Sequence, residues 1–149
     1  MPTPLRELAW RRALRLLAAH DRSTHEIRTR LDASGAAPEI IAATVSRLQE
    51  LHYLDDERFA RTTAEAAARR GYGSERVRAE LTAKGVAEPL VDAAIAAAFA
   101  DEPALARGAL TRRFPTPPRG ARERAKAARF LLQRGFPEAV VLAILGEGC

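Results

Sequence analysis

The feature that most constrains the fold of this chain is an internal repeat of 50 residues. A leucine followed four positions later by a glycine occurs three times at this spacing, at Leu31–Gly35, Leu81–Gly85 and Leu131–Gly135. A repeat of this length indicates a tandem array of small units that bury their apolar faces together. The same register holds at further apolar positions: Ile27, Val77 and Ala127; Ile40–Ile41, Leu90–Val91 and Val140–Val141; Val45, Ile95 and Leu145.

The first unit is predicted to contain three helices. Leu14 and Leu17 follow the 3.6-residue period of a helix. The sequence STHE at Ser23–Glu26 has the form of a capping box, in which the serine oxygen accepts from a free backbone N–H and the glutamate reaches back to the cap. Gly35 is expected to end this second helix in a left-handed conformation. Pro38 then suits the first turn of a third helix, where no N–H is needed.

The other two units follow the same plan. In the second, helices are predicted over residues 56–70, 74–84 and 88–99. In the third, the prolines between Phe114 and Gly120 forbid a continuous helix, and helices follow over residues 121–134 and up to about Leu145. No segment alternates as a strand does. The sequence therefore predicts an all-α fold of three tandem three-helix, helix-turn-helix-like repeats in an elongated or curved array, with repeats at residues 1–54, 55–100 and 101–149.

One acidic run, YLDDERFA at Tyr53–Ala60, has the residue types of a metal or acid–base site. The repeat register places Asp55 at a helix N-cap, where its carboxylate accepts from backbone N–H groups of the first turn. The next two acids lie in that turn, where the helix dipole favours negative charge. Leu54 and Phe59 have the spacing of a hydrophobic staple. The structural interpretation accounts for the whole run, so it is favoured over a catalytic one.

The remaining composition argues against catalysis, metals and membranes. The single cysteine, Cys149, excludes a disulfide framework and a zinc site, and the histidines at positions 20, 25 and 52 lack ligand spacing. No phosphate-binding loop or nucleophile–base pair is present. Arginines interrupt the N-terminal segment, which excludes a signal peptide and a membrane span there. We expect a cytoplasmic, monomeric, non-enzymatic protein without cofactor or metal, whose terminal thiol is exposed.

The charge indicates a polyanionic partner. The formal net charge is +5, and 22 of the 24 basic residues are arginines. A basic surplus favours association with nucleic acid or another acidic surface, and the planar guanidinium matches phosphate better than an ammonium does. Residues 101–149 carry nine basic and five acidic residues, more surplus base than either of the other thirds.

Two basic surfaces are candidates for binding nucleic acid or a filament. The first is a stripe on the predicted helix of the third unit, formed by Arg122, Lys126 and Arg129, with Arg119 at the helix entrance. At about 100° per residue the stripe is narrow, so it can follow a phosphate backbone. An ordinary solvated helix face has the same pattern, and the sequence leaves both interpretations open.

The second candidate surface surrounds the sequence RRGYG, whose glycines would allow a close backbone approach to a ligand. Its arginines can bind phosphate or carboxylate in a forked geometry. Tyr72 either stacks on a base or packs at a helix junction. Arg28 and Arg78 occupy one repeat position, and a basic group repeated every 50 residues would suit a partner that also repeats. The candidate residues here are Arg28, Arg69, Arg70, Tyr72, Arg76 and Arg78.

Four stretches of the sequence together resemble the RecX family of bacterial RecA regulators. YLDDERFA with RRGYGSERVRAELTAKGV (Arg69–Val86) resembles the central block of that family, STHEIRTRLDASG (Ser23–Gly35) its first repeat, and RFLLQRGFP (Arg129–Pro137) its last. The matches occur in family order over residues 9–147. Residues 61–68 depart from the pattern because they lack larger apolar side chains, and the proline break before Arg119 is unusual.

The resemblance implies both a fold and a function. The fold would be tandem three-helix repeats without catalytic residues. The protein would bind RecA filaments on single-stranded DNA, lying in the filament groove and restraining RecA ATPase, strand exchange and coprotease activity in recombination, DNA repair and the SOS response. The partners implied are RecA and the single-stranded DNA within its filament.

Two other functions remain open from the residues alone. A duplex-DNA transcription regulator is one, because each unit resembles a helix-turn-helix domain, but such proteins dimerise on paired half-sites and no dimer element is evident. A protein-only helical-repeat scaffold is the other, and the net charge of +5 argues weakly against it. Without the family resemblance, the residues support a helical-repeat binding protein, with nucleic acid as one possible ligand.

Overall fold

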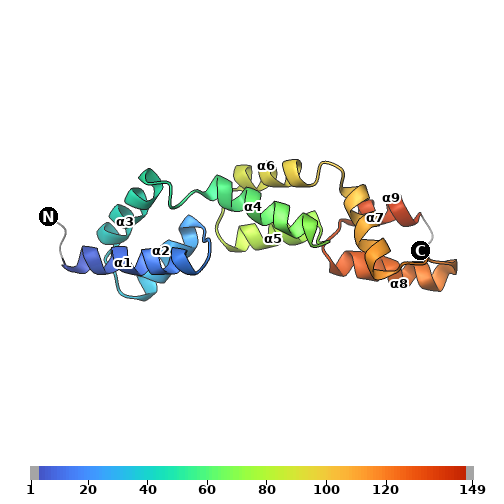
Figure 1. The fold of residues 1–149 in the computed structure, drawn as a ribbon, viewed down its shortest axis with the longest axis horizontal. Coiled ribbons are helices and arrows are strands. Elements are labelled where there is room, and N and C mark those ends of the chain that lie inside the picture. Colours follow the sequence, from blue (N-terminus) through green and yellow to red (C-terminus); the bar gives the residue numbers. More distant parts are fainter. Residues whose placement is uncertain (1–3, 147–149) are drawn as a thin grey trace.

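The computed structural model describes residues 4–146, and within that range it contains helices joined by short turns and no strand. The all-α prediction is confirmed. Figure 1 shows the helices in three groups that follow one another along the long axis, with α1 at one end and α8 and α9 at the other. The helices are α1 Pro4–Ala19, α2 Thr24–Ala33, α3 Pro38–Glu50, α4 Asp56–Arg69, α5 Ser74–Ala83, α6 Glu88–Ala98, α7 Glu102–Arg113, α8 Gly120–Gln133 and α9 Glu138–Leu145.

The helix starts follow the capping signals in the sequence. Ser23 caps α2, and both halves of the capping box form: the Glu26 N–H donates to Ser23 Oγ at 3.2 Å, and the Ser23 N–H donates to Glu26 Oε1 at 2.9 Å. Asp55 caps α4 by accepting from the Arg58 N–H at 3.0 Å. The acidic run is therefore a helix start, as the sequence predicts.

The second helix of each repeat ends in the same way. Gly35, Gly85 and Gly135 have φ values of +90°, +74° and +93°, the left-handed conformation that glycine adopts without a Cβ clash. In each case the N–H of the residue after the glycine donates to a carbonyl five residues earlier at 3.1 Å, which closes the helix end. These bonds join Ala36 to Leu31, Val86 to Leu81 and Phe136 to Leu131.

Each repeat has its own hydrophobic core. The leucines that define the repeat, Leu31, Leu81 and Leu131, are all 0% exposed and belong to three separate clusters. The staple predicted between Leu54 and Phe59 is wrong, because Leu54 closes the core of the first repeat while Phe59 belongs to that of the second. The chain therefore passes from the first core to the second within the acidic run, between Leu54 and Phe59.

The predicted repeat limits fall between helices. Residue 54 lies between α3 and α4, and residue 100 lies between α6 and α7; the limits themselves stay predictions. Within residues 4–146, no helix is long and apolar enough to cross a membrane. Over the same range, no cluster of His, Cys, Asp and Glu side chains could hold a metal ion. The expectation for Cys149 lies outside the described residues.

Candidate nucleic-acid interface

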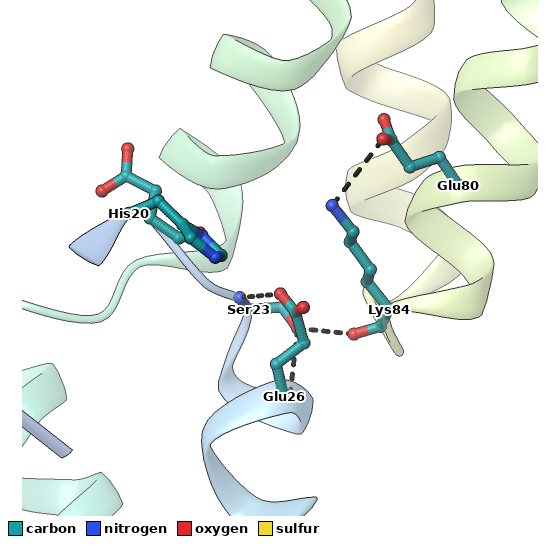
Figure 2. Close-up of polar contacts among 6 residues, drawn as sticks. His20, Ser23, Glu26, Glu80 and Lys84 are labelled. Atoms are coloured by element: carbon teal, nitrogen blue, oxygen red, sulfur yellow. Dashed lines mark hydrogen bonds and ion pairs between the residues drawn. The ribbon is translucent and has the colours of Figure 1, made fainter. Parts of the chain in front are cut away.

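Neighbouring repeats meet through one contact that recurs 50 residues later. At the first junction, Ser23 Oγ at the start of α2 donates to the Lys84 carbonyl at the end of α5, at 2.5 Å. Figure 2 shows this bond beside the capping box and the Glu80–Lys84 pair. At the second junction, the Gly73 N–H before α5 donates to the Arg134 carbonyl after α8, at 2.8 Å. The end of each middle helix thus docks on the start of the preceding one.

A carboxylate from the following repeat completes each junction. Asp56 Oδ1 accepts from the Thr24 N–H at 2.8 Å, although Asp56 belongs to α4 and Thr24 to α2. Glu102 of α7 accepts from the Ser74 N–H and from Ser74 Oγ, both at 2.8 Å. The sequence suggested only that Asp56 complements the dipole of its own helix. Its bond to Thr24 appears only in the tertiary structure.

The second junction brings two backbones into direct contact. A Cβ placed on Gly73 would lie 2.4 Å from the backbone of Gly135, and a Cβ on Gly135 would lie 2.5 Å from the Cβ of Arg76. The glycine of RRGYG at position 73 therefore allows a close approach between repeats. Gly73 leaves no space for a ligand, whereas the other glycine of this sequence, Gly71, lines a hollow beside the junction. The close approach of a ligand to the backbone stays a prediction for Gly71.

Tyr72 lies at the same junction, half-buried, with two guanidinium groups over its ring. The Cζ atoms of Arg76 and Arg134 are 4.0 and 4.7 Å from the ring centroid. Both distances are within the range of a cation–π interaction. The packing interpretation of Tyr72 accounts for this arrangement, since a base could stack there only where an arginine moved aside.

Four arginines gather beside this junction around a hollow of about 190 Å³. Arg70 follows the C-terminus of α4, Arg112 and Arg113 form the last turn of α7, and Arg134 follows the C-terminus of α8. The ion pairs found among residues 4–146 are Glu7–Arg11, Arg78–Asp92 and Glu80–Lys84, so none of these four arginines pairs with a carboxylate in that range. We call this set the junction hollow.

A second hollow of about 350 Å³ adjoins the first and shares Arg113 and Phe130 with it. Lys126 and Arg129 of α8 line it together with Phe114. The rings of Phe114 and Phe130 meet edge to face, with centroids 5.6 Å apart. Cations interleaved with aromatic rings are the features of a surface that binds single-stranded nucleic acid.

The structure separates the candidates of the sequence into two sets. Arg70, Lys126 and Arg129 line the adjoining hollows, and Tyr72 and Arg76 lie at the junction next to them. The other candidates line neither hollow, although all are exposed; they are Arg28, Arg69, Arg78, Arg119 and Arg122. Of these, Arg78 pairs with Asp92 at 2.7 Å.

Three residues of the junction hollow were missed by sequence reasoning. Arg112 and Arg113 directly precede Phe114 and the proline break, and Arg134 directly precedes the repeat glycine Gly135. A basic residue at a helix C-terminus complements the dipole of that helix, so the sequence offered an ordinary reason for each. Only the junction brings them to one place.

The first repeat has a basic hollow of a different kind. Arg12, Arg15 and Arg30 line a hollow of about 460 Å³ between α1 and α2, entirely within one repeat. In the second repeat the position of Arg30 is taken by Glu80, which pairs with Lys84 at 3.7 Å. The basic hollows therefore lie in the first repeat and from the second junction into the third repeat.

Comparison with known proteins identifies all three repeats. Residues 9–48, 55–95 and 100–145 match the first, second and third three-helix domains of RecX. The chain is 40% identical over 136 residues to the regulatory protein RecX of Cronobacter sakazakii, covering 84% of this chain and 82% of that one. It is 42% identical over 124 residues to the regulatory protein RecX of Chromohalobacter salexigens, with 83% and 82% coverage.

Solved structures agree on the fold. The crystal structure of RecX from Lactobacillus salivarius superposes with a TM-score of 0.77 over 96% of both chains, at 18% identity. A second crystal structure of a regulatory protein RecX gives a TM-score of 0.75 over 96% of this chain and 72% of that chain, at 23% identity. The names of these relatives describe regulatory proteins and not enzymes. Three matching domains in the expected order and these identities over most of the chain show that this protein belongs to the RecX family.

Proposed function

We propose that this protein binds RecA and RecA filaments on single-stranded DNA in the cytoplasm and restrains RecA ATPase, strand exchange and coprotease activity. The observation that carries the proposal is the run of basic side chains over the junction hollow and its neighbour in a member of the RecX family. None of the four arginines of the junction hollow pairs with a carboxylate of residues 4–146. A filament on DNA presents phosphates and acidic side chains, to which arginine binds in a forked geometry.

The shape of the molecule suits this partner. Three repeats follow one another along a single axis (Figure 1), so one molecule acting as a monomer can contact more than one subunit of a filament. Several weak contacts made by one linked molecule act together through their high effective concentration. We expect inhibition because a ligand that binds across neighbouring subunits favours the arrangement to which it binds and opposes any change in it.

The test is the DNA-dependent ATPase rate of the RecA from the same organism on single-stranded DNA, with this protein added in increasing amounts under reducing conditions. We expect the rate to fall at less than one molecule per RecA subunit. An unchanged rate at several-fold excess would contradict the proposal. Binding to duplex DNA without RecA would then be measured by fluorescence anisotropy, since tight duplex binding is what a helix-turn-helix transcription regulator requires.

A further inference from the structure

We infer that the junction hollow is a phosphate site shared by the second and third repeats, and that its ligand is a phosphodiester group of single-stranded DNA. The inference rests on the proposed function and specifies one contact within it. Its basis is the convergence of Arg70, Arg112, Arg113 and Arg134 around one hollow.

The charge at the hollow calls for an anion. Like charges at close range repel one another, and no acidic side chain within residues 4–146 forms an ion pair with any of the four arginines. The acidic residue Glu102 also lies at this junction, but its carboxylate accepts hydrogen bonds from the N–H and hydroxyl of Ser74. A bound anion would offset the repulsion and would be held by several charge-assisted hydrogen bonds at once.

The geometry favours phosphate over a carboxylate. The four arginines that line the hollow come from three separate chain segments, after α4, at the end of α7 and after α8. The guanidinium groups of Arg113 and Arg134 are supported by aromatic rings, with Arg113 Cζ 4.7 Å from the Phe114 centroid and Arg134 Cζ 5.2 Å from the Phe130 centroid. A tetrahedral phosphate presents oxygens in several directions, whereas the two oxygens of a carboxylate lie in one plane and suit one or two forks. Gly71 also lines the hollow. A Cβ added there would lie only 3.0 Å from Arg112 Nη2, so the absence of a side chain at position 71 leaves room for the Arg112 guanidinium.

The neighbouring hollow favours a strand of DNA over a free phosphate ion. It continues the site with Lys126 and Arg129, which can hold the next phosphates, and with the rings of Phe114 and Phe130. Arg113 and Lys126 lie over Phe114, and Arg134 lies over Phe130, so a base meets either ring where these cations turn to the phosphates. Single strands bind where cations follow the backbone and aromatic rings meet the bases. A free ion would use only the first hollow.

The site also couples ligand binding to the contact between repeats. Arg70 belongs to the second repeat, and the other three arginines belong to the third. The Gly73 N–H bond to the Arg134 carbonyl joins the same two repeats through the backbone. A phosphate held from both sides therefore opposes separation of the repeats, and a ligand that binds only the native junction raises the temperature of unfolding.

The experiment compares two double variants that lose the same charge. Arg70→Gln with Arg112→Gln removes one exposed arginine from each side of the hollow. Arg61→Gln with Arg107→Gln removes one exposed arginine from α4 and one from α7, away from both hollows. Binding of a short labelled oligodeoxythymidine is measured by fluorescence anisotropy at several salt concentrations. All four positions are exposed, and circular dichroism checks that both variants are folded.

We expect the hollow variant to bind the oligonucleotide about tenfold or more weakly than the control variant. Its plot of log affinity against log salt should be shallower by about 0.7 for each phosphate that the variant no longer binds. The single substitutions Arg70→Gln and Arg112→Gln should be non-additive, since both arginines contact one group. Equal affinity and equal slope in the two double variants would overturn the site.

A second arm separates the two sources of phosphate. The thermal unfolding midpoint of the unmodified protein is measured with oligodeoxythymidine, with inorganic phosphate, and with sodium chloride at matched ionic strength. A rise with the oligonucleotide that exceeds the rise with inorganic phosphate, and that disappears in the hollow variant, supports the inference. If inorganic phosphate raises the unfolding midpoint while the oligonucleotide neither raises it nor binds, the assignment to DNA is overturned.

Failure of the site and failure of the proposed function are distinguishable. If the unmodified protein inhibits RecA while both double variants bind the oligonucleotide equally, the site is wrong and the function stands. If binding of the oligonucleotide depends on the hollow arginines while the unmodified protein leaves the RecA ATPase rate unchanged, the site stands and the function is wrong.

Discussion

At the scale of single residues, glycines with the same conformation have different roles. Gly35 and Gly135 occupy one repeat position and share a φ near +90°. A Cβ on Gly35 would meet nothing within 4 Å, whereas a Cβ on Gly135 would lie 2.5 Å from the Cβ and 2.8 Å from the backbone nitrogen of Arg76. Gly35 is therefore needed only for its backbone conformation, and Gly135 also for the close approach of the third repeat to the second.

Replacing each of these glycines with alanine separates the two effects. Gly35→Ala should lower the free energy of unfolding by about 1–2 kcal/mol, the cost of a side chain in the left-handed region. Gly135→Ala should cost at least about 1–3 kcal/mol more, because the overlap with Arg76 must also be relieved. Urea denaturation of both variants measures the difference. Equal losses of unfolding free energy in the two variants would mean that the junction accommodates the added Cβ without destabilisation.

At the scale of helices, a carboxylate from one repeat caps the start of a helix in the repeat before it. α5 begins after Gly73, which has no side chain to act as a cap. Glu102 of α7 supplies the missing acceptor by binding both the N–H and the hydroxyl of Ser74. Asp56 has the equivalent role for α2 at the Thr24 N–H. Free N–H groups at a helix start need such partners, so each junction also completes a helix.

Removing the cross-repeat cap should destabilise the second junction. Glu102→Ala leaves the Ser74 N–H and hydroxyl without their charged acceptor, and a hydrogen bond to a charged group contributes about 1.5–3 kcal/mol. We expect a loss of about 2–3 kcal/mol in the free energy of unfolding by urea. Glu88→Ala, an exposed acid in the first turn of α6, should cost less than about 1 kcal/mol as the matched control. A loss no larger than this control would show that the cap is not needed.

At the scale of the whole molecule, charge is distributed in a pattern along the array. The basic hollows lie in the first repeat and from the second junction into the third repeat. In the second repeat, by contrast, Glu80 and Asp92 pair with Lys84 and Arg78. An elongated molecule whose basic hollows lie at two separated places is expected to contact a polyanion at both of them.

If the basic stripe of α8 follows a single strand of DNA, its side chains should contribute to binding through their charge alone. Arg122→Gln with Lys126→Gln should weaken binding to RecA filaments and to oligodeoxythymidine most at low salt. The slope of log affinity against log salt should fall by about 0.7 for each phosphate no longer bound. Anisotropy titrations over a range of sodium chloride concentrations provide the measurement, with Arg61→Gln and Arg107→Gln as the control of equal charge. A slope equal to that of the control would assign the stripe to an ordinary solvated surface.

Much of the fold was predictable because its signals are local. The predicted helices over residues 56–70, 74–84, 88–99 and 121–134 agree with α4, α5, α6 and α8 to within one residue at either end. Capping boxes, N-terminal prolines and left-handed glycines act on the nearest turn of chain. The staple between Leu54 and Phe59 was wrong because spacing along a helix does not reveal which core each side chain enters.

The candidate site was predictable only in part. Arg70, Lys126 and Arg129 were identified from basic clusters in sequence, and they do line the hollows. Arg112, Arg113 and Arg134 were missed, since each has an ordinary place at a helix end. Arg78 fits the sequence pattern of a binding residue, but Asp92 holds it in an ion pair that no local pattern predicts.

By itself, the sequence determined the helices, their ends and the threefold repetition, because backbone capping and apolar periodicity act within one or two turns of chain. Only the tertiary structure decided where the charges meet. Arg70 and Arg134 are 64 residues apart in the chain, and they reach one hollow because Gly73 and Gly135 let two backbones touch. That contact depends on the absence of side chains at two distant positions, whose pairing no local pattern encodes.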